Sequence, residues 1–289
     1  MIIQLLINGL INGLIYSLVA MGFALVYNTT KTFHIAYSAI YMIPPYIFLT
    51  FNKKLELNFF LSAIIAILTA VVVSIIVELF VYKPLVNKKS SKNVITVSSI
   101  GVMIILINLI ALIYGNETKI LQSDISNTAN FLNITVTYTQ IYQFIIAIII
   151  IGIFWMILKK TNFGIIVRGI SDNKKLSLIL GLNLSFFRIF LFALSGFFAA
   201  SGSLLIAYDV GMDPYVGMPM FLNVVVAMII GGIGDFRGPI LGGMVIGLLQ
   251  AVVIWFASSQ WQTAITFFIL IIFLLFRPQG ILGKKLRRV

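Results

Sequence analysis

Two sets of polar residues repeat at helical spacing inside stretches that are otherwise apolar. One set is His34, Tyr37, Ser38 and Tyr41, at positions i, i+3, i+4 and i+7, which share one face of a helix. Hydroxyl groups and aromatic rings on one helical face suit the lining of a path for a small polar solute. The alternative is an aromatic belt at the membrane surface with one interfacial histidine.

The second set lies near the start of the sequence. Gln4, Asn8, Asn12 and Tyr16 are each four positions apart and form one polar stripe on a helix. Amides that faced lipid would lose their hydrogen bonds, so the stripe has to face protein or water. Interhelical hydrogen bonding and the lining of a path both fit this pattern. Asn8 and Asn12 therefore join the first set as candidate substrate-path residues.

The sequence contains few residues that could support redox, metal-binding or proton-transfer chemistry. The sequence has no cysteine and one histidine, which excludes disulfides and thiolate chemistry and argues against a metal site. Glu78 is the one carboxylate expected within a span. It lies about one turn from Lys83, which predicts ion pairing or snorkelling there. One carboxylate and one histidine do not make a proton relay. Single amides in the apolar stretches are expected to serve in helix packing: Asn108, Asn223 and Gln250.

These residues belong to a chain with the composition of a membrane protein. Hydrophobic residues are 61% and charged residues 10%, whereas a soluble domain is nearer half apolar and a quarter charged. Apolar stretches of about 20 residues predict an all-α polytopic membrane protein with eight or nine transmembrane helices. The count stays open because one stretch contains Pro44 and Pro45 and another is short and rich in glycine. The predicted spans are 2–27, 33–51, 59–82, 94–114, 140–158, 187–208, 217–233, 238–257 and 261–276.

The cations predict the orientation of the spans. All except Lys53, Lys54 and Lys119, that is 17 of the 20, fall in segments that an alternating topology puts on one side. That side is cytoplasmic by the positive-inside rule, so nine spans leave the N-terminus outside and the C-terminus inside. The net charge of +12 is explained by this placement, and no nucleic acid partner is expected.

Glycines gather in the run GGIGDFRGPILGG at 231–243. The run lacks the GxxxxGK[ST] pattern and a βαβ context, so nucleotide binding by this chain is rejected. Small residues four apart allow close approach of two helices, as the Gly9 and Gly13 pair also does. The candidate packing glycines are Gly9, Gly13, Gly231, Gly232, Gly234, Gly238, Gly242 and Gly243.

A weak internal symmetry accompanies this pattern. The first and sixth predicted spans run in opposite directions, are rich in small residues, and are each followed by an interrupted span. Opposed halves with matching interrupted spans are typical of an inverted repeat. Chance similarity between apolar helices is the alternative.

Several segments resemble permeases of branched-chain amino-acid ABC importers. The run GGIGDFRGPILGG is similar to the GGxGxxxGxxxGG segment of that family, and GIIVRGISDNKKLSLILGLN is similar to its cytoplasmic coupling segment. NGLINGLIYSLVAMGFALVYNTTKTFHIAYSAIYM resembles its first two spans, and FRPQGILGK resembles its last exit. The similarity covers nearly the whole chain, which predicts a single transmembrane permease domain over 1–289.

The resemblance implies the role and the partners of the chain. It implies a permease subunit of a bacterial cytoplasmic (inner) membrane importer, without covalent chemistry of its own. It also implies two ATPase subunits, a second permease that is homologous or identical, and an extracytoplasmic binding protein. No cofactor is expected on this chain, because ATP and Mg would bind the ATPase. Transport would proceed by alternating access of a small polar solute, with an amino acid favoured.

The resemblance also assigns a coupling role to the polar, basic loop at 159–188. Within it, Asn173 to Leu180 are predicted to form a short helix with Gly181 as its C-cap. Cations of the loop would meet an acidic rim on the ATPase, or serve as positive-inside anchors. The candidate coupling residues are Arg168, Asp172, Asn173, Lys174, Lys175, Gly181 and Asn183.

One departure leaves the solute open. The family typically has Asn-Phe-Ala-His-Gly at the start of the second span, where this chain has His-Ile-Ala-Tyr-Ser at 34–38. Another amino acid, urea, a simple sugar or a nucleoside would then be alternatives to a branched-chain amino acid. An ion- or proton-coupled carrier is the alternative mechanism. An intramembrane enzyme is disfavoured because no general base suits Ser195 or Ser201.

Overall fold

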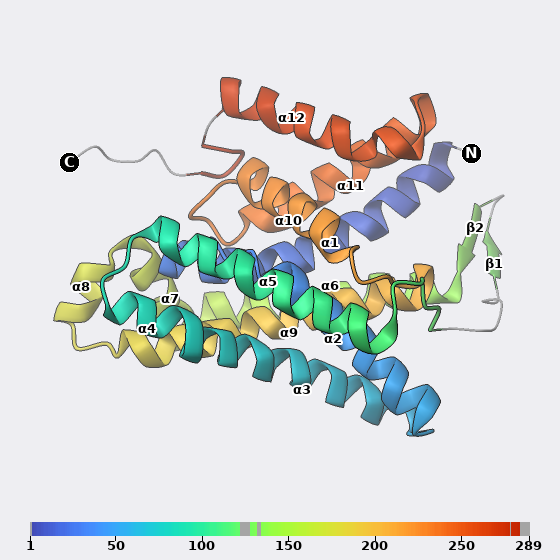
Figure 1. Ribbon diagram of the computed structural model, residues 1–289. Helices are drawn as coiled ribbons and strands as arrows, with labels where there is room; N and C mark the ends of the chain where they lie inside the picture. Colours follow the sequence, from blue (N-terminus) through green and yellow to red (C-terminus); the bar gives the residue numbers. More distant parts are fainter. Residues whose placement is uncertain (1, 122–127, 132–133, 278, 284–289) are drawn as a thin grey trace. The chain divides into compact units, whose positions relative to one another are not determined.

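The computed structural model of the chain describes residues 2–121, 128–131, 134–277 and 279–283. These residues are mostly helical, with one short hairpin (Figure 1). The helices are α1 Ile2–Thr30, α2 Tyr37–Leu49, α3 Phe59–Val77, α4 Lys83–Asn87, α5 Lys92–Tyr114, α6 Tyr138–Lys160, α7 Asn162–Asp172, α8 Lys174–Ile179, α9 Leu184–Val210, α10 Gly217–Gly231, α11 Gly238–Phe256 and α12 Gln262–Phe276. The strands are β1 Thr128–Phe131 and β2 Ile134–Thr137.

Each of the nine apolar stretches contains a helix, and seven of the described helices are long and apolar enough to cross a membrane. The two stretches that left the count open contain the short helices. The first, α2, continues through Pro44 and Pro45 for 13 residues and passes directly into a π-helical segment at Thr50–Lys54, and α10 has 15. At 1.5 Å per residue, α10 spans about 23 Å, less than the hydrocarbon core of a bilayer.

The long apolar helix α3 continues into α4 through a π-helical turn at Glu78–Tyr82. Pro84 follows this turn and has no N–H to donate to the preceding turn of helix. The π-helical turn therefore lies where the regular ladder of hydrogen bonds is interrupted, and it carries Glu78.

The hairpin of β1 and β2 is a feature that the all-α prediction missed. It lies in the polar segment after α5, with Thr128 opposite Thr137 and Phe131 opposite Ile134. The side chain of Gln4 bonds to this hairpin: its Nε2 donates to the Thr135 oxygen at 2.6 Å, and its Oε1 accepts from the Thr135 nitrogen at 2.9 Å. Gln4, the first residue of the predicted polar stripe, thus satisfies backbone groups of β2.

The described residues form two compact units. Unit 1 comprises Met1–Ala24, Ser123–Trp155 and Leu222–Val289, and unit 2 comprises Leu25–Gln122 and Met156–Phe221. Three helices, α1, α6 and α10, run from one unit into the other. The prediction of a single permease domain stays a prediction.

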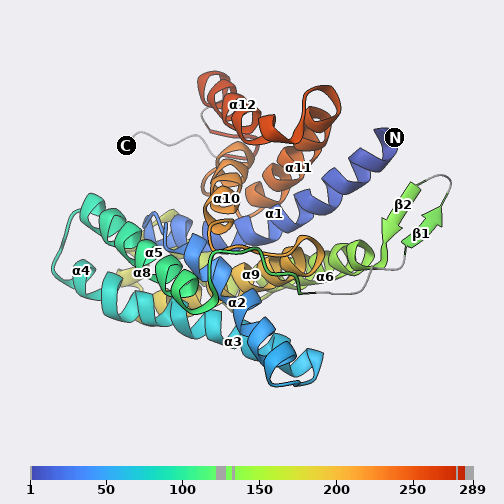
Figure 2. The same ribbon diagram turned by 45° about the vertical axis from the view of Figure 1, so that its right-hand side comes forward.

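In unit 2, α2, α3 and α9 contact one another and α5 packs on α2. Figures 1 and 2 show these helices side by side. A Cβ added at Gly196 of α9 would lie 2.8 Å from the Ala70 oxygen and 2.9 Å from the Ser74 Cβ of α3, so only glycine permits this approach. The Ser74 hydroxyl donates to the Phe192 carbonyl at 2.6 Å across the same contact. Close approach and a buried hydrogen bond together hold α3 against α9.

Unit 1 has a second close contact, between the first part of α1 and α11. A Cβ added at Gly9 would lie 2.7 Å from the Gly247 oxygen, and one added at Gly13 would lie 3.1 Å from the Gly243 oxygen. The Ser17 hydroxyl also donates to the Ile240 carbonyl at 2.7 Å. The structure therefore places the glycine pair of the first span against glycines of α11 at small-residue spacing.

The turn between α10 and α11 is closed by glycines and by a later segment. A Cβ on Gly231 would collide with the Gly238 backbone, and Gly232 and Gly234 have φ values of 115° and 97°. The Ile281 nitrogen donates to the Ile230 carbonyl at 2.8 Å, and the Leu282 nitrogen donates to the Gly231 carbonyl at 2.9 Å. Carbonyls at the end of α10 are thereby satisfied.

Replacing Gly247 with valine is expected to weaken unit 1, because the new side chain would collide with the backbone of Gly9 and Gly13. Overpacking of this kind costs about 1–3 kcal/mol, so the thermal unfolding midpoint of the detergent-purified protein should fall. Gly152→Val is the matched control, since a Cβ at Gly152 of α6 meets nothing within 4 Å. Equal midpoints for the two variants would contradict this packing.

Candidate functional site

The loop at 159–188 folds into α7 and α8. Thr161 caps α7 by accepting a hydrogen bond from the Gly164 nitrogen at 3.3 Å. Gly164 lies against the Leu158 backbone, where a Cβ has no room, and the Arg168 guanidinium donates to the Leu158 carbonyl. Buried Val167 continues the inward face of α7. The first helix of the loop therefore folds back on the end of α6.

The second helix, α8, is closed at both ends by its own sequence. Asn173 caps it by accepting from the Leu176 nitrogen at 3.1 Å. At the other end, Leu182 N donates to Ser177 O at 3.2 Å and Gly181 N donates to the Leu178 carbonyl at 3.0 Å. With φ of 79° at Gly181, this is a Schellman motif. The predicted short helix with Gly181 at its end is confirmed.

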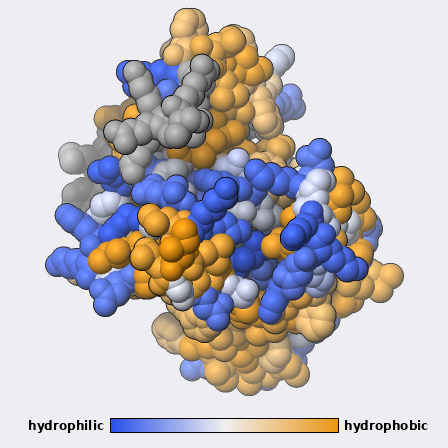
Figure 3. Space-filling view, turned by 90° about the vertical axis from the view of Figure 1, so that its left-hand side faces the viewer, coloured by the Kyte–Doolittle hydropathy of each residue, from blue (hydrophilic) through white to orange (hydrophobic). Residues whose placement is uncertain are grey.

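The tip of α8 carries exposed apolar side chains. Leu178, Ile179 and Leu180 are 55%, 81% and 71% exposed. Figure 3 shows apolar residues among hydrophilic ones on the face that carries α4, α7 and α8. An apolar patch rimmed by polar residues marks a protein or membrane contact. The sequence signal for this tip is the apolar run LSLILGL between two polar segments, which the prediction based on the loop's cations missed.

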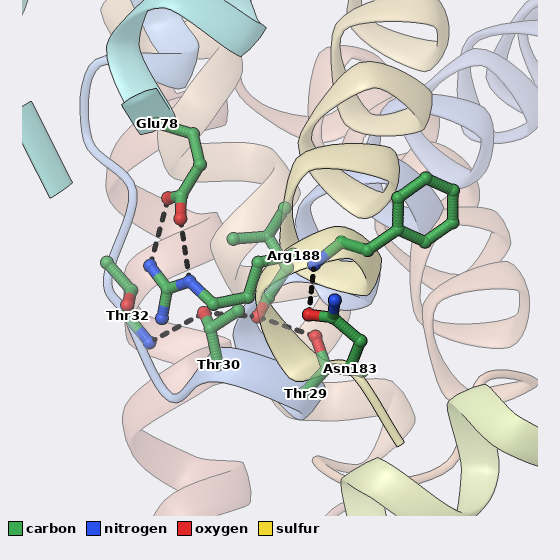
Figure 4. Close-up of polar contacts among 8 residues, drawn as sticks. Thr29, Thr30, Thr32, Glu78, Asn183 and Arg188 are labelled. Carbon is green, nitrogen blue, oxygen red and sulfur yellow. Dashed lines mark hydrogen bonds and ion pairs between the residues drawn. The ribbon is translucent and has the colours of Figure 1, made fainter. Parts of the chain in front are cut away.

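A buried ion pair joins the end of this segment to α3. Asn183 caps α9 by accepting from the Phe186 nitrogen at 3.2 Å, and Arg188 follows one turn later (Figure 4). Arg188 Nε and Nη2 donate to the two Glu78 carboxylate oxygens at 2.6 Å and 2.9 Å. The side chains are 11% and 1% exposed. The predicted ion pairing of Glu78 is confirmed, but its partner is Arg188, 110 positions away, and not Lys83.

Two lysines of unit 2 have lowered pKa values. The pKa of Lys174 is lowered, first by burial and then by the nearby Arg188, with Glu78 acting in the opposite direction. The pKa of Lys31 is lowered by burial and by Lys92, against the attraction of Asp172. Lys174 and Arg188 line a small hollow with Thr29, Thr30, Ile170, Leu184, Phe187 and Leu191. The candidate coupling residues are all exposed: Arg168, Asp172, Asn173, Lys174, Lys175, Gly181 and Asn183.

The predicted face of the second span is buried at the start of α2. His34 Nδ1 lies 2.8 Å from the Tyr82 hydroxyl, which donates to Ser99 Oγ at 2.7 Å. Ser99 Oγ also accepts from the Ala36 nitrogen at 2.9 Å. His34 Nε2 has no partner among the described residues. All four residues of the face are buried within unit 2: His34, Tyr37, Ser38 and Tyr41.

The other two candidate path residues belong to unit 1. Asn12 is exposed, and Asn8 is partly buried and accepts from Gln4 Nε2 at 3.4 Å. The assignment of the six residues to a substrate path stays a prediction.

Seven described helices of membrane-spanning length define a polytopic membrane protein. A family model for the "Branched-chain amino acid transport system / permease component" matches residues 5–275. The chain belongs to this family. It is a transport component and not an enzyme, and its span-length helices agree with the predicted location in the cytoplasmic membrane.

Curated relatives match over nearly the whole chain. The high-affinity branched-chain amino acid transport system permease protein BraD of Pseudomonas aeruginosa is 27% identical over 98% of this chain and 96% of its own length. LivH of Escherichia coli K12, with the same description, is 25% identical over 98% and 96%. A ribose import permease protein, RbsC of Haemophilus influenzae, is 28% identical over 35% of this chain and 34% of its own length.

A solved structure shares the fold. PsaBC from Streptococcus pneumoniae in complex with Fab aligns with a TM-score of 0.53 at 15% identity, over 94% of this chain and 91% of that chain.

Removing one partner of the buried pair should destabilise the protein strongly. Arg188→Met leaves the Glu78 carboxylate buried without a counter-charge, which costs about 3–5 kcal/mol. The double variant Glu78→Gln with Arg188→Met removes both charges and should recover a large part of the thermal unfolding midpoint. Arg237→Met is the control, because the Arg237 side chain is 58% exposed and its pair with Asp235 should contribute little. A double variant no more stable than Arg188→Met would contradict this account.

Proposed function

We propose that the chain is the membrane-spanning permease subunit of an ATP-driven importer that moves a small polar solute inward by alternating access. Two ATPase subunits, a second permease that is homologous or identical, and an extracytoplasmic binding protein complete the complex. ATP and Mg bind the ATPase, and this chain binds no cofactor. Membership of a family of transport-system permease components supports this assignment.

The exposed tip of α8 is the observation that carries the proposal. Leu178, Ile179 and Leu180 belong to neither of the long apolar helices on either side. Exposed leucine and isoleucine on a capped helix suit a groove on a partner protein. The cations Lys174 and Lys175, on the first turn of the same helix, suit an acidic rim around that groove.

Coupling then follows from how α8 is attached. Closure of the ATPases displaces α8, and the short connection through Asn183 passes this displacement to α9. Arg188 ties α9 to Glu78, so α3 is moved with it. The Ser74 bond and the contact at Gly196 keep α3 and α9 together along the bundle. A rigid pair of helices driven from one end is a suitable element for alternating access.

The orientation and span count complete the proposal. We retain eight or nine spans, with the N-terminus outside, the C-terminus in the cytoplasm and the two halves forming an inverted repeat. The loops with α4, α7 and α8 then lie inside the cell. Four of the cations that support this orientation lie outside the described residues: Lys284, Lys285, Arg287 and Arg288.

The favoured solute is an amino acid. The relatives BraD and LivH are described as branched-chain amino acid permeases, and a partial relative as a ribose permease. The run at 34–38 departs from the family pattern, so we propose an amino acid without restricting it to leucine, isoleucine or valine. The alternative, a proton- or ion-coupled carrier, is disfavoured because Glu78 already neutralises Arg188.

Replacing Gly181 with valine tests the coupling role. A β-branched residue in the left-handed backbone conformation of Gly181 is strained by about 1–3 kcal/mol. This strain disfavours the native end of α8, and about 1.4 kcal/mol corresponds to about a tenfold change. ATP-dependent uptake should therefore fall by about tenfold. Gly169→Val is the control, because Gly169 lies within α7 and a Cβ there meets nothing within 4 Å. Native uptake by Gly181→Val in the assembled complex would refute coupling through α8.

Single cysteines test the orientation, since the chain has none of its own. A cysteine at Thr128, on β1, should react with a membrane-impermeant thiol reagent added to intact cells. One at Ser91, the N-cap of α5, should react only after the cells are opened. Reaction of Ser91→Cys in intact cells would reverse the proposed topology.

A further inference from the structure

Four side chains in unit 1 form a series of hydrogen bonds. The single hydroxyl hydrogen of Thr266 determines which group donates and which accepts in each of them. The Thr266 hydroxyl donates its one hydrogen to the Gln262 carbonyl at 2.7 Å. Thr266 Oγ1 lies 3.1 Å from Gln250 Nε2 and therefore acts there only as an acceptor. The group of Gln250 that faces α12 has to be its amide nitrogen.

The orientation of Gln250 fixes the next two residues. Its second N–H donates to Asn223 Oδ1 at 3.2 Å, and its Oε1 accepts from the Tyr16 hydroxyl at 3.0 Å. Gln250 and Thr266 are 7% and 4% exposed. Four helices, α1, α10, α11 and α12, thus contribute to one buried network of defined polarity.

The network ends at Asn223. Its oxygen is occupied by Gln250, so it presents the two N–H groups of Nδ2, which have no partner among the described residues. The residue is partly exposed in α10, and Tyr16 lies at the midpoint of the 29-residue α1. Unpaired N–H groups at such a depth are costly in lipid, so they have to face water, protein or a solute.

We propose that Asn223 donates hydrogen bonds to an acceptor group of the transported solute, the carboxylate in the case of an amino acid. Gln250 and Tyr16 are positioning residues that keep the Asn223 nitrogen outward. The inference rests on the proposed transport of a small polar solute. Two N–H donors without a full positive charge bind a carboxylate weakly enough for it to leave, as a transport path requires.

The role differs from helix packing, which the sequence predicts for Asn223. If Asn223 served only in packing, its essential group would be the oxygen that accepts from Gln250. Asn223→Asp keeps that acceptor and the shape of the side chain, and turns the two outward donors into an acceptor. Packing predicts that this variant behaves as the native protein, whereas the inference predicts that it rejects a carboxylate.

The first measurement is ATP-dependent leucine uptake by proteoliposomes that contain the complete complex. Asn223→Asp should lower the maximal rate at least tenfold at pH 8 and recover relative to native as the pH is lowered, because a protonated carboxyl regains one donor. Asn108→Asp is the control, since the Asn108 amide donates to the carbonyl of Ile104 in its own helix. A native rate for Asn223→Asp, or a loss that pH does not change, would overturn the inference.

The second measurement does not depend on transport. Asn223→Cys in the membrane-embedded protein should react with a small sulfonate-bearing thiol reagent at least tenfold faster than Asn108→Cys. Equal labelling rates would overturn the inference whether or not leucine is transported. If Asn223→Cys reacts but the native complex accumulates no leucine, the proposed function fails while the exposure of Asn223 to an aqueous path stands. If the aspartate variant fails to assemble, Asn223→Ser, which keeps a donor and an acceptor, provides the uptake comparison.

Discussion

The buried pair of Glu78 and Arg188 is the interaction on which unit 2 depends. A carboxylate that is 1% exposed needs a counter-charge, and the bidentate guanidinium supplies it with two hydrogen bonds. The pair fixes the position of the start of α9 along the axis of α3. Because Asn183 lies just before, the pair also fixes where the segment with α7 and α8 leaves the bundle. One ion pair thus sets the geometry of the segment that we propose as the coupling site.

Local features of the chain were predictable from sequence. The helices follow from apolar runs of sufficient length, and the end of α8 follows from Gly181, because only glycine adopts its backbone angle easily. Family membership was also predictable, since it depends on segments such as the glycine run at 231–243. The π-helical turn before Pro84 and the hairpin after α5 were not, because several local conformations suit the same residues.

Long-range partners were the part that sequence reasoning missed. Lys83 is near Glu78 in sequence, yet Arg188 binds it, because helix packing rather than chain distance decides which charges meet. The sequence predicted the same role, helix packing, for the amides of Gln250 and Asn223. Their difference follows from a proton that Thr266 gives to a backbone carbonyl, and no pattern of residue types contains that information.

The close contact between α1 and α11 has a consequence for synthesis. Tyr16 and Gln250 are 234 positions apart, so α1 is made on the order of ten seconds or more before its partner helix emerges from the ribosome. During that interval the Tyr16 hydroxyl and the glycine face of α1 lack the helix on which they finally pack. Until α11 is inserted, the polar groups of α1 need other hydrogen-bond partners, either in the insertion machinery or in water. The pace of translation therefore sets how long α1 is in place before α11 can pack on it.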